Sequence, residues 1–138
     1  MRDGIKEQVS NTLDLLHRRA SKADGAPYFD LFTEDAVFIG TDGGERWAMD
    51  EFRAYAQKRF DEGAGWSYRA LSRHVFLSPD GKTAWFDEML EHAEGVARGS
   101  GVLLLEEGGW KVAQYHLCFP IPNGLLRPFR QIIRLMGG

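Results

Sequence analysis

The chain has 138 residues, of which 43% are hydrophobic and 27% charged, a composition typical of one soluble globular domain with a core of its own. Its net charge of −3 argues against nucleic-acid binding, which usually needs a basic surface. The single cysteine, Cys118, excludes an internal disulfide and a zinc site built on several thiolates. Because no signal-like segment or long apolar run occurs, we expect a cytoplasmic protein that does not depend on a membrane.

The first half of the chain predicts three helices and one strand. Apolar residues recur at helical spacing from Ile5 to Ala23 and predict an amphipathic helix of about five turns. A short apolar helix is expected over residues 28–32, directly after Pro27. A buried strand over residues 36–41 and a third helix over residues 48–62 follow, and glycines 63 and 65 end that helix.

The second half predicts four antiparallel strands joined by short turns, because apolar and polar residues alternate from Trp66 to Cys118. Two registers are open at the turn over residues 78–81. A plain turn places His74 opposite Asp87, whereas a bulge at Gly81 places Arg73 there. Helices followed by a strand meander predict an α+β fold, a cone-shaped roll with helices on a curved, mainly antiparallel sheet.

Alternation divides the sheet into a mixed face and an apolar face. A turn at Glu94-Gly95 is expected to pair Arg98 with Glu91, and a three-residue turn at 107–109 extends the same face along the last strand. We predict that this mixed face lines a pocket and that the apolar face packs against a second subunit. The mixed face comprises Trp85, Asp87, Met89, Glu91, Arg98, Ser100, Val102, Val112, Gln114, His116 and Cys118. The apolar face comprises Phe86, Leu90, Leu103, Leu105, Ala113, Tyr115, Leu117 and Phe119.

Short segments throughout the chain carry a family resemblance. They are residues 38–42 (FIGTD), 45–47 (ERW), 80–81 (DG), 84–88 (AWFDE), 98–103 (RGSGVL), 110–115 (WKVAQY) and 120–123 (PIPN). Together with the order of the elements, they resemble the SnoaL-like branch of the nuclear transport factor 2-like superfamily, which also contains ketosteroid isomerase and polyketide cyclases. The resemblance implies a SnoaL-like domain over residues 1–123, with a pocket between helices and sheet and a homodimer formed through the sheets. It implies no particular activity.

Two features depart from that pattern. The first helix has no tyrosine, so the tyrosine donor of ketosteroid isomerase is missing, and the nearest upstream aromatic hydroxyl belongs to Tyr28. The tail over residues 124–138 is a basic amphipathic segment with three arginines and no acid. Such a helix can lie on an anionic membrane, or it can pack on its own domain or on a second subunit. We favour packing.

Asp87 is the first candidate for a general base, since a carboxylate on a semi-enclosed apolar wall loses solvation and its pKa rises. His116 is the second candidate for a catalytic group, as an acid–base partner or a ligand-orienting donor. Arg98 can clamp a substrate oxygen, or it can pair with a carboxylate. The other expected ligand-binding residues are Trp47, Trp66, His74, Trp85, Ser100 and Gln114.

No phosphate-binding loop, dinucleotide fingerprint or metal motif occurs, and we expect no cofactor and no metal. A metal triad of His74, His116 and Asp87 is a weaker alternative. Three functions are consistent with the sequence. The first is binding of an apolar, oxygenated or cyclic small molecule. The second is a cofactor-independent isomerase, cyclase or dehydratase that uses Asp87 as base. The third is a dimeric regulatory or assembly module.

Overall fold

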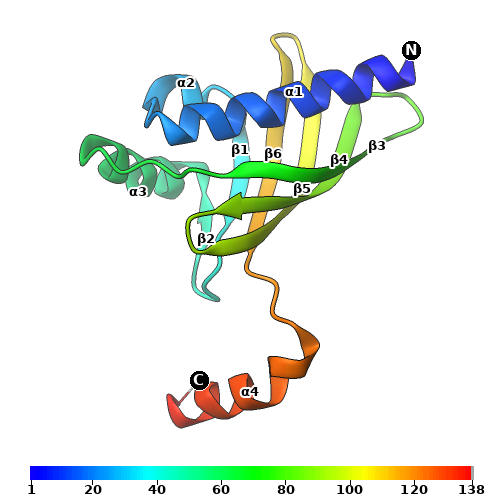
Figure 1. The fold of residues 1–138 in the computed structure, drawn as a ribbon. Helices are drawn as coiled ribbons and strands as arrows, with labels where there is room; N and C mark the ends of the chain where they lie inside the picture. Colours follow the sequence, from blue (N-terminus) through cyan, green and yellow to red (C-terminus); the bar gives the residue numbers. More distant parts are fainter. Residues whose placement is uncertain (138) are drawn as a thin grey trace.

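The computed structural model describes residues 1–137, in which three helices cover one face of a six-stranded sheet (Figure 1). Helix α1 (Arg2–Ser21) buries Val9, Leu13, Leu16 and Ala20 against the sheet because these residues share one helical face. The short α2 (Gly25–Phe29) lies beside α1, and α3 (Met49–Asp61) lies next to α2 and packs on β1 and β2. The predicted α+β roll is confirmed.

The strands form one mixed sheet in the order β2-β1-β6-β5-β4-β3. Strand β1 runs parallel to β6, and the other neighbouring strands pair antiparallel. The sheet is curled without being closed, and a hollow lies between it and the helices. The strands are β1 (Phe32–Ile39), β2 (Arg46–Ala48), β3 (Arg69–Leu77), β4 (Thr83–His92), β5 (Gly95–Glu106) and β6 (Gly109–Cys118).

The sheet face that the helices cover, here called the inner face, is the apolar face predicted from alternation. Tyr115 and Leu117 are 2% and 8% exposed because α1 and its neighbours cover them within the same chain. Phe86, Leu90 and Leu103 are buried with them. The expectation that this face packs on a second subunit is therefore wrong, since the chain's own helices bury most of it and leave only its ends, at Leu105 and Phe119, exposed.

The strand registers differ from the expected ones at two points. Arg98 pairs with Met89 and not with Glu91, the partner expected from the sequence. The reason is that the β4–β5 turn falls at Ala93-Glu94 and not one residue later. Val112 pairs with Leu103 on the inner face, because a bulge next to Val102 shifts the β5–β6 register. At the β3–β4 turn, His74 pairs with Asp87, as the plain-turn alternative predicted.

The C-terminal segment forms helix α4 (Leu126–Leu135) after a short 3-10 turn, η1 (Asn123–Leu125). The helix projects away from the domain (Figure 1), and none of its residues is buried. Packing on its own domain, one of the two packing modes expected from the sequence, is therefore not seen. Among residues 1–137, no helix is both long and apolar enough to cross a membrane.

Candidate active site

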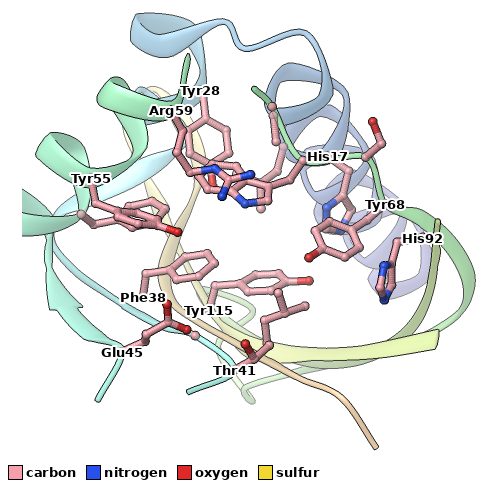
Figure 2. Close-up of a pocket in the computed structure, with 18 of the residues that line it drawn as sticks. His17, Tyr28, Phe38, Thr41, Glu45, Tyr55, Arg59, Tyr68, His92 and Tyr115 are labelled. Atoms are coloured by element: carbon pink, nitrogen blue, oxygen red, sulfur yellow. The ribbon is translucent and has the colours of Figure 1, made fainter. Parts of the chain in front are cut away.

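A cavity of about 500 Å³ lies between the helices and the inner face of the sheet (Figure 2). Phe38 on β1 stacks on Phe52 of α3 and on Tyr115 of β6, with ring centroids 4.3 and 5.6 Å apart. Such walls suit a flat, largely apolar molecule, because aromatic rings offer large rigid contact areas. The aromatic residues that line the cavity are Tyr28, Phe38, Trp47, Phe52, Tyr55, Trp66, Tyr68, Tyr115 and Phe119.

A buried carboxylate, Glu88 of β4, lies beneath the cavity wall. Its residue is 1% exposed, because it alternates with Phe86 and Leu90 on the inner face. A charged group in that position is stable only when other groups neutralise and hydrogen-bond it. The partners of Glu88 therefore define the chemistry of this wall.

Both carboxylate oxygens of Glu88 are engaged. Nε2 of His17, on α1, lies 2.8 Å from Oε2, and the Tyr115 hydroxyl donates to the same oxygen at 2.6 Å. Nε of Arg73, on β3, donates to Oε1 at 2.8 Å. Nη2 of Arg73 approaches Oε1 at 2.7 Å as an ion pair, but without the angle of a hydrogen bond. His17 and Tyr115 also line the cavity, so the network reaches its surface.

Arg73 connects this network to the first helix. Its Nη1 donates to the carboxylate of Asp14 at 2.8 Å and to the hydroxyl of Ser10 at 2.7 Å. The Arg73 side chain is 8% exposed, whereas that of Asp14 is 51% exposed. A row of hydrogen-bonded side chains thus runs from Asp14 on the surface of α1 through Arg73 and Glu88 to His17. This row holds α1 against β3 and β4 in a defined position.

The network keeps Glu88 ionised. Burial favours the neutral acid, but the hydrogen bond with His17, the charge of Arg73 and the Tyr115 hydroxyl together lower the pKa of Glu88. Burial and the adjacent Glu88 charge raise the pKa of Tyr115, which stays a protonated donor. An ionised carboxylate only accepts hydrogen bonds, so Nε2 of His17 must carry a hydrogen. Nδ1 is then the nitrogen that can accept a proton.

A second hydroxyl lies close to His17. The ring centroids of Tyr68 and His17 are 6.3 Å apart in an edge-on arrangement. Burial raises the pKa of Tyr68; the nearby Arg59 acts in the opposite direction and does not cancel the rise. Tyr68 is therefore a protonated donor at neutral pH. A base and a hydrogen-bond donor thus share one end of the cavity, an arrangement suited to proton transfer.

Gly99 of β5 makes room for the Tyr115–Glu88 hydrogen bond. A Cβ atom at this position would collide with the hydroxyl of Tyr115 and come within 3.1 Å of Oε2 of Glu88. The glycine is therefore part of the site, although it has no side chain to contribute.

Gly99→Ala is expected to lower the free energy of unfolding by about 1–3 kcal/mol, the usual cost of overpacking a filled interior. Urea unfolding followed by tryptophan fluorescence measures it. Gly108→Ala in the β5–β6 turn is the matched control, because its Cβ would meet nothing closer than 3.9 Å. Equal effects of the two substitutions would contradict the close packing around Tyr115.

The structure separates the residues predicted from the sequence into two groups. Trp47 and Trp66 line the cavity. The other predicted residues lie on the opposite, outer face of the sheet, in rows such as His74–Asp87–Ser100–His116 and Trp85–Val102–Gln114. Arg98 lies on that face beside Met89 and Cys118. The division into two faces is thus as predicted, apart from Val112 and Ala113 at the bulge, but the cavity is on the apolar face and not on the mixed one.

Nothing in the cavity geometry supports a base at Asp87 or an acid–base role for His116. Asp87 is exposed on the outer face, and His116 is separated from the cavity by the sheet itself. The metal alternative for this row also lacks support, because no group of three potential metal ligands occurs within residues 1–137.

Sequence reasoning missed His17, Arg73, Glu88 and Tyr115. A signal for His17 was present, because it lies four residues after the buried Leu13 and three before the buried Ala20, on the apolar face of α1. Glu88 alternates with Phe86 and Leu90 in the same way. Because buried polar groups need hydrogen-bond partners, a histidine and a carboxylate on two predicted core faces are candidates to pair with each other.

The family model of the SnoaL-like domain matches residues 9–122, which is most of the chain. The chain belongs to the SnoaL-like family. The resemblance that the sequence segments implied is thereby confirmed. A comparison of this SnoaL-like protein with curated proteins gives no match.

Solved structures share the fold of this SnoaL-like protein at low sequence identity. A proposed dehydratase of the NTF2-like family from Streptomyces avermitilis has a TM-score of 0.77 at 14% identity, covering 88% of this chain and 100% of that one. A proposed aromatic ring hydroxylase from Novosphingobium aromaticivorans has a TM-score of 0.71 at 19% identity, covering 85% of this chain and 90% of that one. A proposed ketosteroid isomerase from Shewanella frigidimarina has a TM-score of 0.66 at 13% identity, covering 83% of this chain and 97% of that one. These similarities establish the fold, which is compatible with several activities.

Proposed function

We propose that this SnoaL-like protein binds a flat cyclic molecule in the cavity and catalyses a proton transfer on it, with His17 as the general base. The observation that carries the proposal is the contact between His17 Nε2 and the buried Glu88 carboxylate, at the wall of an aromatic cavity. A histidine oriented by a carboxylate is a recurrent acid–base device.

In the proposed reaction, Nδ1 of His17 takes a proton from a carbon next to a carbonyl group. The electron pair of the broken C–H bond forms a C=C bond, and the carbonyl π pair moves onto oxygen as an enolate. The hydroxyl of Tyr68 stabilises this oxygen, and Glu88 stabilises the imidazolium. If the ketone is β,γ-unsaturated, the enolate is a dienolate, and return of the proton to its γ carbon gives the conjugated isomer. If the ketone carries a β-hydroxyl group, the enolate re-forms the carbonyl, its C=C pair forms the Cα=Cβ bond, the C–O bond breaks, and the hydroxyl takes the proton from His17 and leaves as water. Both outcomes proceed without a redox cofactor.

This proposal keeps the cofactor-independent isomerase or dehydratase class considered from the sequence, but its base is His17 rather than Asp87. Binding without turnover is the simpler function that the same cavity supports. The two differ in one observable, the transfer of a proton from bound ligand.

Exchange of the α-protons of 2-tetralone in D₂O, followed by ¹H NMR, tests the proposal directly. This bicyclic ketone has acidic C–H groups next to its carbonyl, and exchange requires only the proton-abstraction step. The wild-type protein is expected to accelerate exchange well above the rate in buffer alone. If the protein binds the ketone but does not accelerate the exchange, the enzymatic proposal is overturned and the cavity has a binding function only.

We also propose that the protein forms a homodimer through the outer sheet face. Phe76 and Trp85 stack on that face with centroids 6.0 Å apart and are 45% and 46% exposed. Exposed aromatic pairs of this kind are typical of interfaces. Helix α4 adds an uncovered apolar side and three arginines, whereas all acidic residues of the chain precede it. A second copy offers both an apolar surface and the complementary charge.

The wild-type protein is accordingly expected to be a dimer at tens of micromolar in multi-angle light scattering. Trp85→Glu should convert it to a folded monomer, because a charge would be placed in the centre of the apolar contact. Glu106→Gln, at the exposed end of β5, is a control that should remain dimeric. A wild-type monomer at these concentrations would contradict the assignment of the outer face.

A further inference from the structure

We propose that Arg59 makes the cavity selective for a cyclic molecule that bears a carboxylate group, an inference that rests on the proposed binding function of this cavity. Arg59 belongs to α3 and lines the cavity, into which its side chain extends in Figure 2. Its Nε is buried without a hydrogen-bond acceptor, and Arg59 forms no ion pair within residues 1–137. By contrast, the buried side chain of Arg73 has a carboxylate partner on each side.

The surroundings of Arg59 fix the plane of the guanidinium but leave its edges unpaired. The guanidinium carbon lies 4.9 Å from the ring centroid of Trp66, a cation–π distance. This stack orients the group by its face and satisfies none of its N–H donors. The donors are therefore available to an acceptor that enters the cavity.

The acidic residues of the cavity do not neutralise Arg59. Glu45 accepts a hydrogen bond from the backbone N–H of Asp42 at 3.0 Å, and Glu94 is exposed in the β4–β5 turn. Neither forms an ion pair with Arg59. Glu88 is already held by Arg73, His17 and Tyr115. A partly buried positive charge in an aromatic cavity thus lacks its counter-charge.

A carboxylate would bind the unpaired guanidinium of Arg59 more strongly than a neutral acceptor would. The planar guanidinium presents pairs of N–H groups that match the two oxygens of a carboxylate, and the charge-assisted bonds are stronger than neutral ones. The aromatic walls exclude a heavily hydrated ligand and favour a ring attached to the carboxylate. Arg59 reaches the cavity from α3 and His17 from α1, and the two side chains lie apart along the cavity (Figure 2). A ligand anchored by its carboxylate at Arg59 would therefore present its ring to His17.

Isothermal titration with 2-naphthoate and 2-naphthamide tests the inference, because the two probes have the same ring and nearly the same shape but differ in charge. Wild-type protein is expected to bind naphthoate about tenfold or more tightly than naphthamide. Arg59→Gln should weaken the binding of naphthoate by about that factor and leave the affinity for naphthamide within about twofold of wild type. Arg59→Lys keeps the charge and should retain part of the preference. Lys58→Gln is the matched control, since it removes one exposed positive charge from the same helix.

Equal wild-type affinities for the two probes would overturn the inference, and this measurement needs no variant. An equal loss of affinity for both probes in Arg59→Gln would also overturn the inference, because that result would assign Arg59 only a stacking role against Trp66. An equal effect of Lys58→Gln would point to overall charge and not to this site. The outcome is independent of the proposed catalysis, because exchange of the neutral 2-tetralone tests His17 without a carboxylate.

Discussion

Replacing His17 with glutamine is expected to lower the rate of 2-tetralone α-proton exchange by about 10²–10⁴-fold, the usual contribution of a general base. The glutamine amide can still donate a hydrogen bond toward Glu88, so the buried carboxylate keeps a partner. It cannot accept a proton at neutral pH. The substitution therefore removes the proposed chemistry while it preserves most of the wall, and NMR exchange rates at saturating ketone measure the loss.

His116→Gln is the control for this experiment. It changes the same residue type on β6, one position from Tyr115, but on the outer face of the sheet. Exchange by this variant is expected to stay within about threefold of wild type, a margin of less than 1 kcal/mol in barrier height. If His116→Gln abolished exchange and His17→Gln did not, the catalytic group would lie on the face first predicted from the sequence.

Glu88→Gln is expected to lower the free energy of unfolding by about 3–5 kcal/mol, the range for removal of one partner from a buried ion pair. The substitution leaves Arg73 buried with Asp14 as its remaining counter-charge, and it removes an acceptor from His17 and Tyr115. Urea unfolding at neutral pH measures the change. Glu91→Gln, three residues along β4, is the matched control. Its ion pair with Arg69 has side chains 53% and 71% exposed and should contribute less than about 1 kcal/mol.

The same carboxylate predicts a pH dependence. The folded protein holds the pKa of Glu88 below its ordinary value of 4.5. Ionised Glu88 therefore contributes stability that is present above pH 4.5 and is lost as the pH falls through the lower, folded-state pKa. The wild-type protein should lose stability below about pH 4.5 more steeply than Glu88→Gln does. Parallel pH profiles of the two proteins would contradict the lowered pKa.

Most of the architecture follows from periodicity. The helical spacing from Ile5 to Ala20 and the alternation along residues 83–118 each specify an element and the face that it buries. The registers were less predictable, because a turn displaced by one residue or a bulge next to Val102 changes which residues pair. The three-residue strand β2 was not predicted, since Arg46–Ala48 is too short to show alternation.

The location of the cavity could not be predicted from the two faces of the sheet. Mixed polarity on the face with Asp87 and His116 favours a pocket wall, but the same pattern also fits a half-exposed surface or an interface. The real cavity has a largely aromatic lining, and the carboxylate beneath its wall, Glu88, is fully paired. Its key residues, His17 and Glu88, are separated by 71 positions in the chain. Their contact depends on how α1 crosses the sheet, which periodicity does not describe.

Tryptophan side chains offer the most direct test of where ligands bind. Trp47 and Trp66 line the cavity, Trp85 lies on the outer face, and Trp110 is buried in the core. In a ¹⁵N-labelled protein titrated with 2-tetralone, the indole N–H signals of Trp47 and Trp66 are expected to shift strongly while that of Trp85 stays in place. A shift of the Trp85 signal with unchanged Trp47 and Trp66 signals would place the ligand on the outer face and contradict the account.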